Sequence, residues 1–207
     1  MKVERKADHA VSESSCKSAT GKTLAEWFKA LDQQGGVALG RRVLSKWIER
    51  EHDVDLWWAT TITNEFEIAR GDHAKDGKPK GYSICPTKSI KASPQVCYRA
   101  FTTAKALDTW FGPKHDVDLR DGGHWRNGDG NRAAIKKVNP GKNIRLIAED
   151  SGLTLPTPVE IKFTPNGAHC TVMVAIERLQ TRAEADGYRR AWGEALDRLK
   201  AAVESSG

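Results

Sequence analysis

The sequence predicts an α+β protein in which a small helical domain precedes an antiparallel sheet of about seven strands and a long C-terminal helix. Three observations indicate this. Residues 22–70 carry apolar side chains at helical spacing, residues 115–177 contain short runs in which apolar and polar side chains alternate, and residues 182–203 carry one apolar stripe. The 207 residues are enough for one large domain or two small ones.

The helical domain, residues 20–71, is expected to contain three helices. Thr23 and Glu26 have the spacing of a capping box, and double glycine is a common helix stop. Four tryptophans can fill a small core between the helices. We expect a first helix from Thr23 to Gly35-Gly36, a second over about 41–51, and a third that is capped by Asp53 or Asp55 and ends at Gly71.

Two other segments lack the apolar residues that a packed element needs. Residues 1–19 are charged and have no apolar stretch, so they predict a disordered tail rather than a secretory signal. Residues 72–81 contain glycine, proline and charges but no large apolar side chain, which predicts a linker. The second domain then covers residues 82–204. Without a signal or an apolar run of ~20 residues, the expected location is the cytoplasm, with no membrane partner.

The second domain is expected to begin with a strand over 82–92 and a helix over 93–111, where Ser93 caps and Pro94 takes the first helical position. Thr181 and Glu184 form a capping box at the start of the last helix. Glycine- and asparagine-rich turns separate the remaining strand candidates. These are 115–119, 123–127, 131–138, 143–149, 157–163 and 169–177.

The stretch "TWFGPKHDVDLRDGGHWR" (109–126) allows three interpretations: the rim of a cavity, a metal site or a plain hairpin. Alternate side chains of a strand point to opposite faces, so the acidic and histidine side chains cannot all converge on one ion. The hairpin and cavity-rim interpretations remain, with Trp110 and Phe111 at the rim. The metal candidates would be His115, Asp116, Asp118, Asp121 and His124, and we expect no metal.

Charge argues against a nucleic-acid partner. The net charge is +6, from 33 basic and 27 acidic residues, and the basic residues are scattered. A helix-turn-helix interpretation of the first domain places Asp55, Glu65 and Glu67 on the helix that would enter the groove, where phosphates would repel them. The loop "NGDGN" (127–131) lacks the helix and lysine of a phosphate-binding loop and predicts a hairpin turn.

Catalytic and cofactor signatures are also missing. The four cysteines form no C-x-x-C pair, and neither G-x-S-x-G nor H-E-x-x-H occurs. No cofactor is expected. Acid–base catalysis stays open, because His124, Glu149 or Tyr188 could serve if they face a desolvated cavity.

Four local patterns resemble a known superfamily. They are "AFTTAKALDTWFGP" (100–113), "DLRDGGHWR" (118–126), "TPNGAHCTVMV" (164–174) and "YRRAWGEALDRLK" (188–200). In this order and spacing, residues 82–204 resemble the START-related helix-grip (SRPBCC) proteins, and within them the activator of Hsp90 ATPase homologue branch. Ala191-Trp192 stands where many members have Gly-Trp. The resemblance implies a curved sheet wrapped around the C-terminal helix, with a cavity between them. Four further stretches are "TGKTLAEWF" (20–28), "SKWIEREHDV" (45–54), "WWATTIT" (57–63) and "ARG" (69–71). Through them, residues 20–71 resemble a small bacterial helical domain of unknown function.

Three functions follow as hypotheses. The first is binding of a small hydrophobic or amphipathic ligand between the sheet and the last helix, as a carrier or sensor. The second is a cyclase- or dehydratase-type enzyme in the same cavity, and the third is a co-chaperone-like module whose helical domain binds a protein partner. The side chains expected to line the cavity are Trp110, Phe111, Trp125, Ile135, Ile147, Phe163, Met173, Tyr188, Trp192 and Leu196. A shift of one residue in a strand would exchange its inward and outward positions.

Overall fold

The computed structural model describes residues 1–205 and divides the chain into two compact units. The helical unit is Ala7–Tyr82, and the sheet unit combines Met1–Lys6 with the chain from Ser83 onward. The division therefore falls just after the segment that the sequence marks as a linker. The first six residues belong to the sheet unit although the helical unit follows them in the chain.

The helical unit packs around a core that includes Trp27, Ile48 and Phe66. The capping box of Thr23 and Glu26 is confirmed, and Asp55 caps the helix that follows it. Its elements are α1 (Glu13–Thr20), α2 (Leu24–Gln34), the short 3-10 helix η1 (Gly36–Leu39), α3 (Arg41–His52) and α4 (Leu56–Ala69).

Helix α1 lies where the sequence indicated a disordered tail. Ser12 and Ser15 cap each other's backbone at its start, and Cys16 is fully buried in the core of the helical unit. One small apolar side chain in a polar segment is enough to dock a short helix, but it leaves almost no periodic pattern to detect. The three helices expected over residues 20–71 are α2, α3 and α4, and α1 adds a fourth helix from the segment that was expected to be a tail.

The segment expected to be a linker has a fixed course within the helical unit. The Lys80 ammonium lies 2.6 Å from a carboxylate oxygen of Asp72, and Arg41 donates a hydrogen bond to the Gly81 carbonyl at 2.7 Å. Arg41 also pairs with Glu67, whose side chain is buried. Ion pairs and hydrogen bonds of charged side chains therefore hold this segment in place, although it has no large apolar residue to pack.

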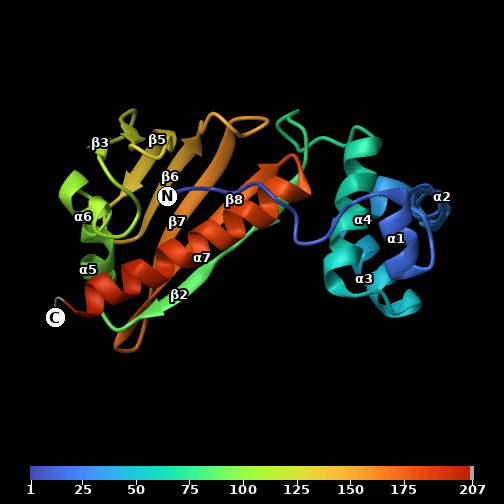
Figure 1. Ribbon diagram of the computed structural model, residues 1–207, viewed down its shortest axis with the longest axis horizontal. Coiled ribbons are helices and arrows are strands. Elements are labelled where there is room, and N and C mark those ends of the chain that lie inside the picture. The colour runs from blue at the N-terminus through green and yellow to red at the C-terminus, as the bar shows by residue number, and fades with distance from the viewer. Residues whose placement is uncertain (206–207) are drawn as a thin grey trace. The chain divides into compact units, whose positions relative to one another are not determined.

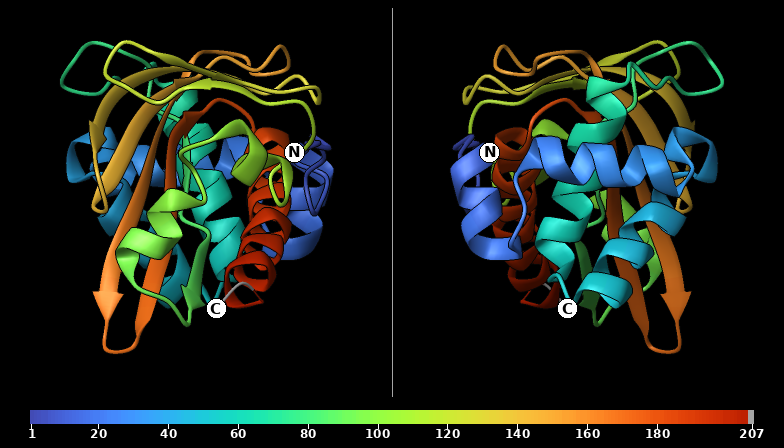
Figure 2. Two further views of the ribbon diagram at one scale, coloured as in Figure 1. Left: turned by 90° about the vertical axis from the view of Figure 1, so that its left-hand side faces the viewer. Right: turned by 90° about the vertical axis from the view of Figure 1, so that its right-hand side faces the viewer.

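The sheet unit is an α+β helix-grip fold. Its eight strands run in the order β1-β8-β7-β6-β5-β4-β3, with β2 also paired to β8, and the sheet bends around α7 (Figures 1 and 2). The elements are β1 (Tyr82–Ile84), β2 (Thr87–Ile90), α5 (Pro94–Arg99), α6 (Ala104–Asp108), β3 (Asp116–Asp118), β4 (His124–Arg126), β5 (Arg132–Asn139), β6 (Asn143–Ala148), β7 (Thr157–Asn166), β8 (His169–Leu179) and α7 (Arg182–Glu204).

The segment expected to form one strand over 82–92 forms two, so the sheet has eight strands instead of the expected seven. Proline has no N–H to donate, so the ladder is interrupted at Pro86, whose carbonyl still accepts from Val174 at 2.9 Å. Both β1 and β2 pair with β8. Pro86 therefore divides the expected strand into two segments, both at the edge of the sheet.

The single helix expected over 93–111 is wrong, because α5 and α6 are separate. The Thr102 hydroxyl donates to the Arg99 carbonyl at 2.8 Å, and Thr103 caps α6 by accepting from the Ala106 amide at 3.2 Å. Two consecutive threonines thus end one helix and start another. This break carries the chain across the end of the sheet toward Trp110 and Phe111.

Helix α7 is the element that the sheet surrounds. The capping box of Thr181 and Glu184 is confirmed, and Tyr188, Trp192 and Leu196 are buried one turn apart along its inner face. Within residues 1–205, no helix combines the length and apolar composition needed to cross a membrane.

Candidate functional site

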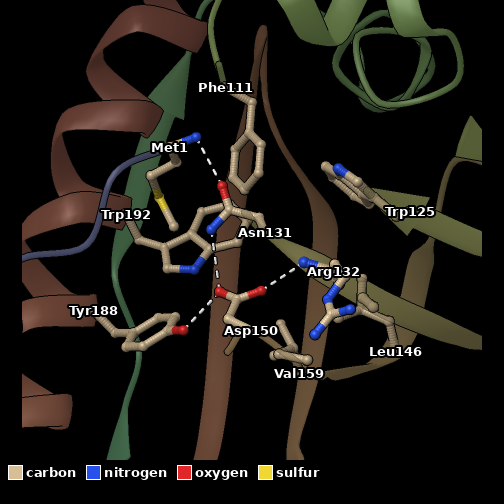
Figure 3. A pocket seen from close by; sticks show the side chains of 12 residues that line it. Met1, Phe111, Trp125, Asn131, Arg132, Leu146, Asp150, Val159, Tyr188 and Trp192 are labelled. Carbon is tan, nitrogen blue, oxygen red and sulfur yellow. Dashed lines mark hydrogen bonds between the residues drawn. The ribbon is translucent and has the colours of Figure 1, made fainter. Parts of the chain in front are cut away.

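A cavity of about 40 Å³ lies between α7 and the curved sheet (Figure 3). Strands β4 to β7 line one face of the cavity, α7 lines the opposite face, and Phe111 closes one side. The lining is apolar except at one wall, where amide, carboxylate and hydroxyl groups gather. The lining residues are Met1, Phe111, Trp125, Asn131, Arg132, Ala133, Leu146, Ala148, Asp150, Val159, Tyr188 and Trp192.

The apolar lining follows from strand alternation and helix periodicity. Leu146 and Ala148 are two positions apart on β6 and point to the same face, while Tyr188 and Trp192 are four apart on α7. The Phe111 ring lies between sheet and helix, 5.0 Å from the Trp192 ring and 5.2 Å from the Trp125 ring. Tilted aromatic contacts of this kind hold the wall of the cavity in place.

The polar wall is centred on Asp150. Its Oδ2 accepts hydrogen bonds from the Tyr188 hydroxyl at 2.6 Å and from Asn131 Nδ2 at 3.1 Å, and its Oδ1 accepts from the Arg132 amide at 2.6 Å. Burial, followed by the nearby Asp150 charge, raises the pKa of Tyr188 above its ordinary value. The phenol therefore stays protonated and acts as a donor.

Met1 enters the cavity beside this wall (Figure 3). Its amine donates to Asp129 Oδ2 at 2.7 Å and to Asn131 Oδ1 at 2.8 Å, and the residue is 3% exposed. Burial lowers the pKa of the amine, and the hydrogen bond to Asp129 opposes that shift. Its side chain lies beside Trp192 and fills space that would otherwise belong to the cavity.

Residues 1–6, here called the N-terminal strap, run along α7 in an extended course (Figure 1). Arg190 on α7 donates to the Lys6 carbonyl at 2.7 Å and to the Glu4 carbonyl at 3.3 Å. The strap can approach this closely because α7 has a glycine there. A Cβ on Gly187 would lie 2.4 Å from the Glu4 carbonyl oxygen.

The strap also lines a polar cleft of about 300 Å³, together with the segments around Asp129 and Asp150. The cleft shares Met1, Asn131 and Asp150 with the inner cavity. Met1 therefore borders both the small apolar cavity and the larger polar cleft.

The structure brings together four of the ten side chains expected at the cavity, namely Phe111, Trp125, Tyr188 and Trp192. Ile135, Phe163 and Leu196 are buried in the core without lining the cavity. Trp110 is also buried and lines a separate groove beside α5 and α6.

Ile147 and Met173 lie on the opposite face of the sheet. Leu146 and Ala148 take the inward positions of β6, and Val172 and Val174 are the buried neighbours of Met173 on β8. This is the one-residue shift that a strand apolar on both faces leaves undecided.

The candidates for metal binding and acid–base chemistry do not gather at one site, although His124 Nε2 lies 3.3 Å from Asp116 Oδ1. His115 is buried behind Phe111 with its Nδ1 2.7 Å from Asp108 Oδ1, while His124 and Glu149 are exposed. Burial lowers the pKa of His115, against the opposing effect of Asp108. Within residues 1–205, no group of three histidine, cysteine or acidic side chains is arranged to hold a metal ion.

Sequence reasoning missed the polar half of the site. Asp129 and Asn131 belong to "NGDGN", which does form the hairpin turn between β4 and β5 but also presents two acceptors to the Met1 amine. The density of amide and carboxylate side chains in one short turn was the available signal. Nothing in the sequence connects Met1 to a loop 128 residues further along.

Comparison with solved structures gives the same fold for the sheet unit. The CalU16 crystal structure from Micromonospora echinospora is 18% identical, with a TM-score of 0.53, over 58% of this chain and 75% of that chain. Protein MLL2253 from Mesorhizobium loti is 15% identical (TM-score 0.54; 61% and 99%). The Aha1 dimer from Colwellia psychrerythraea is 21% identical (TM-score 0.54; 59% and 96%). At these identities the likeness shows the fold alone.

A search of curated proteins gives no match. The family model described as activator of Hsp90 ATPase homolog 1-like protein, in contrast, matches residues 91–204, which is more than half of the chain. The matched region begins just before α5 and ends with α7, so it includes nearly the whole cavity wall. The chain therefore belongs to the family of activator of Hsp90 ATPase homolog 1-like proteins.

Proposed function

We propose that the sheet unit binds a small apolar or amphipathic ligand in the cavity under α7, in a carrier or sensor role. The observation that carries this proposal is the occupant of the cavity. Met1 fills it with an unbranched side chain from an extended segment, not with a residue of the helix or the sheet. An occupant of this kind can leave without unfolding the walls.

The sizes of the two chambers support binding by replacement. A cavity of about 40 Å³ holds roughly one or two waters, whereas small-molecule sites occupy about 300–1,000 Å³. The ligand therefore takes the place of Met1 and extends into the polar cleft of about 300 Å³. The apolar part of the ligand contacts Trp125 and Trp192, and its polar end contacts the polar wall of the cavity at Asn131.

Acid–base catalysis in the same cavity is a second candidate, favoured by one observation. Tyr188 is a buried titratable group at the cavity wall with a raised pKa. Asp150 argues for binding instead, because three donors already hold its carboxylate in place and leave at most about one of its roughly four acceptor positions for a substrate. A Tyr188→Phe variant that binds ligand but no longer converts it would favour the enzyme.

The test uses two neighbouring alanines on β5. Ala133 lines the cavity, and Ala134 is the next residue along the strand, so its side chain points to the opposite face. Ala133→Leu adds volume inside the cavity, and Ala134→Leu adds the same volume outside it. Each full-length variant is titrated with the uncharged apolar fluorophore N-phenyl-1-naphthylamine and studied by native mass spectrometry for co-purifying small molecules.

We expect Ala133→Leu to lose both fluorophore binding and any co-purifying ligand, while Ala134→Leu keeps the wild-type behaviour. Equal binding by all three proteins would place the ligand site elsewhere and contradict the proposal.

A further inference from the structure

This inference rests on the proposed function and names the class of ligand. We propose that the cavity takes a primary amine with a short, unbranched apolar tail, and that Met1 is the chain's own stand-in for this ligand. The ligand competes with the N-terminal strap for one set of contacts.

The amine is recognised by two acceptors that do not depend on the strap for their positions. Asn127 Oδ1 accepts from the Asp129 amide at 3.0 Å and from the Asn131 amide at 3.1 Å, which fixes the turn. Asn127 Nδ2 and Asn131 Nδ2 donate within the network, at 3.0 Å to Asn131 Oδ1 and at 3.1 Å to Asp150. Asn131 Oδ1 therefore points toward the amine because its own Nδ2 is held by Asp150. These acceptors remain in place when the strap leaves.

Charge selects the same functional group. The Asp129 side chain is only 12% exposed, and among residues 1–205 the Met1 ammonium is its one ion-pair partner. Once the strap has moved away, the Asp129 carboxylate loses this cation and opens to the polar cleft that it lines. An incoming amine restores the pair, whereas an alcohol supplies one donor and no charge, and a carboxylate repels.

The apolar tail is selected by shape. The Met1 side chain lies beside Trp192 and Phe111, and about 40 Å³ of the cavity stays unfilled (Figure 3). An unbranched chain fits this width, and a thioether gains from contact with aromatic rings. A branched tail would meet Trp192 or the sheet.

Beyond Met1, the strap is held as an extended segment and not as part of a helix or strand. Arg190 binds two of its carbonyls, and the strap adds no strand to the sheet and no turn to a helix. Segments held this way are among the first to open locally. A Gly187→Ala substitution should displace the strap, because the added methyl group would lie 2.4 Å from the Glu4 carbonyl oxygen. The helix itself should tolerate the change, since alanine is a better helix former than glycine.

The test compares Gly187→Ala with Gly193→Ala in the full chain. Gly193 lies on the same helix and a Cβ there meets nothing within 4 Å, so this variant is the matched control. A second opening variant adds two glycines before Met1, which turns its amine into a peptide amide. The probes are L-methioninamide and N-acetyl-L-methioninamide, which share the tail and differ in the free amine. Ligand-observed NMR detects weak binding of each.

We expect Gly187→Ala and the extended chain to bind L-methioninamide about tenfold or more tightly than Gly193→Ala or wild type. In the first two proteins the Met1 amine no longer competes for the charge-assisted pair with Asp129, which contributes at least that much. The acetylated probe should bind each protein at least about tenfold more weakly. Equal binding of the two probes overturns the amine class but leaves the proposed function standing. If neither probe nor N-phenyl-1-naphthylamine binds the opened variants, both the inference and the proposed function fail.

Discussion

The Tyr188 hydroxyl on α7 donates a 2.6 Å hydrogen bond to Asp150 Oδ2, which lies just beyond the end of β6. This contact joins the helix to the polar wall of the cavity. It also orients the carboxylate that holds Asn131, and through Asn131 it positions the acceptor of the Met1 amine. Helix, sheet and strap therefore meet at one hydrogen-bonded network.

Tyr188→Phe should lower the free energy of unfolding by about 1–3 kcal/mol, because the buried phenol loses a hydrogen bond to a charged carboxylate. Urea unfolding of the full chain measures this. Tyr98→Phe is the control, since Tyr98 is half-buried and its ring packs on Phe163. If both variants lose the same stability, the hydrogen bond to Asp150 contributes nothing specific.

The two glycines of α7 should respond differently to alanine. Gly193→Ala should raise the free energy of unfolding by about 0.5–1 kcal/mol, since alanine is the better helix former and meets no neighbour. Gly187→Ala should gain less than this, because the new methyl displaces the Glu4 carbonyl. Thermal unfolding of the two variants gives the comparison, and an equal gain would show that the strap does not pack on α7.

Docking of the strap should strengthen as the pH rises toward about 8. The docked amine of Met1 has a lowered pKa, mainly through burial, and the undocked amine has its ordinary value of roughly 8. The undocked strap thus binds more protons, so raising the pH favours docking. Asp129 and Asp150 act against the shift and Arg198 adds to it.

His115 does not interfere in this range, because its pKa is held below the ordinary value of about 6.5 and it stays neutral above that pH. Hydrogen exchange of the strap amides, corrected for intrinsic rates, follows docking between about pH 6.5 and 8. Weaker protection of the strap amides at the higher pH would contradict docking of a Met1 amine with a lowered pKa.

The cysteines should differ sharply in reactivity. Cys85 is exposed, whereas Cys16, Cys97 and Cys170 are buried. Burial, with a further contribution from Cys170, raises the pKa of Cys97 to about 12, so almost no thiolate forms near neutral pH. Mass spectrometry after brief iodoacetamide treatment should find one alkylated cysteine in the native protein. Rapid alkylation of Cys97 in the native state would contradict the buried position.

Much of the fold could be predicted because its signals are local. Capping boxes at Thr23 and Thr181 marked two helix starts, and the alternation of β7 was plain in Val159, Ile161 and Phe163. The break between α5 and α6 was missed because threonine is acceptable inside a helix as well as at its cap. Only the hydrogen bonds of Thr102 and Thr103 decide between these.

The site was harder to predict because it depends on contacts between distant segments. The aromatic residues of α7 and the Phe111 region could be placed from periodicity and resemblance. The choice between Leu146 and Ile147 could not, since both are apolar and adjacent. The docking of the strap could not be predicted, because a single methionine in a charged segment shows no periodic pattern. The turn that binds its amine is also far away in the chain.

The chain has two methionines, Met1 and Met173, which makes its methyl NMR spectrum a direct test of the central claim that Met1 occupies a ligand site under α7. The full-length protein is labelled with ¹³C-methyl methionine and titrated with L-methioninamide, with Gly187→Ala in parallel. Met1 lies among aromatic rings, which shift its resonance, and Met173 lies on the outer sheet face as an internal reference.

The account predicts that the Met1 resonance moves to the position of an exposed methionine as the amine is added, at a lower concentration in Gly187→Ala, while Met173 stays in place. A Met1 resonance that keeps its docked position at saturating amine in both proteins would contradict the account, because the strap would then be a permanent part of the core.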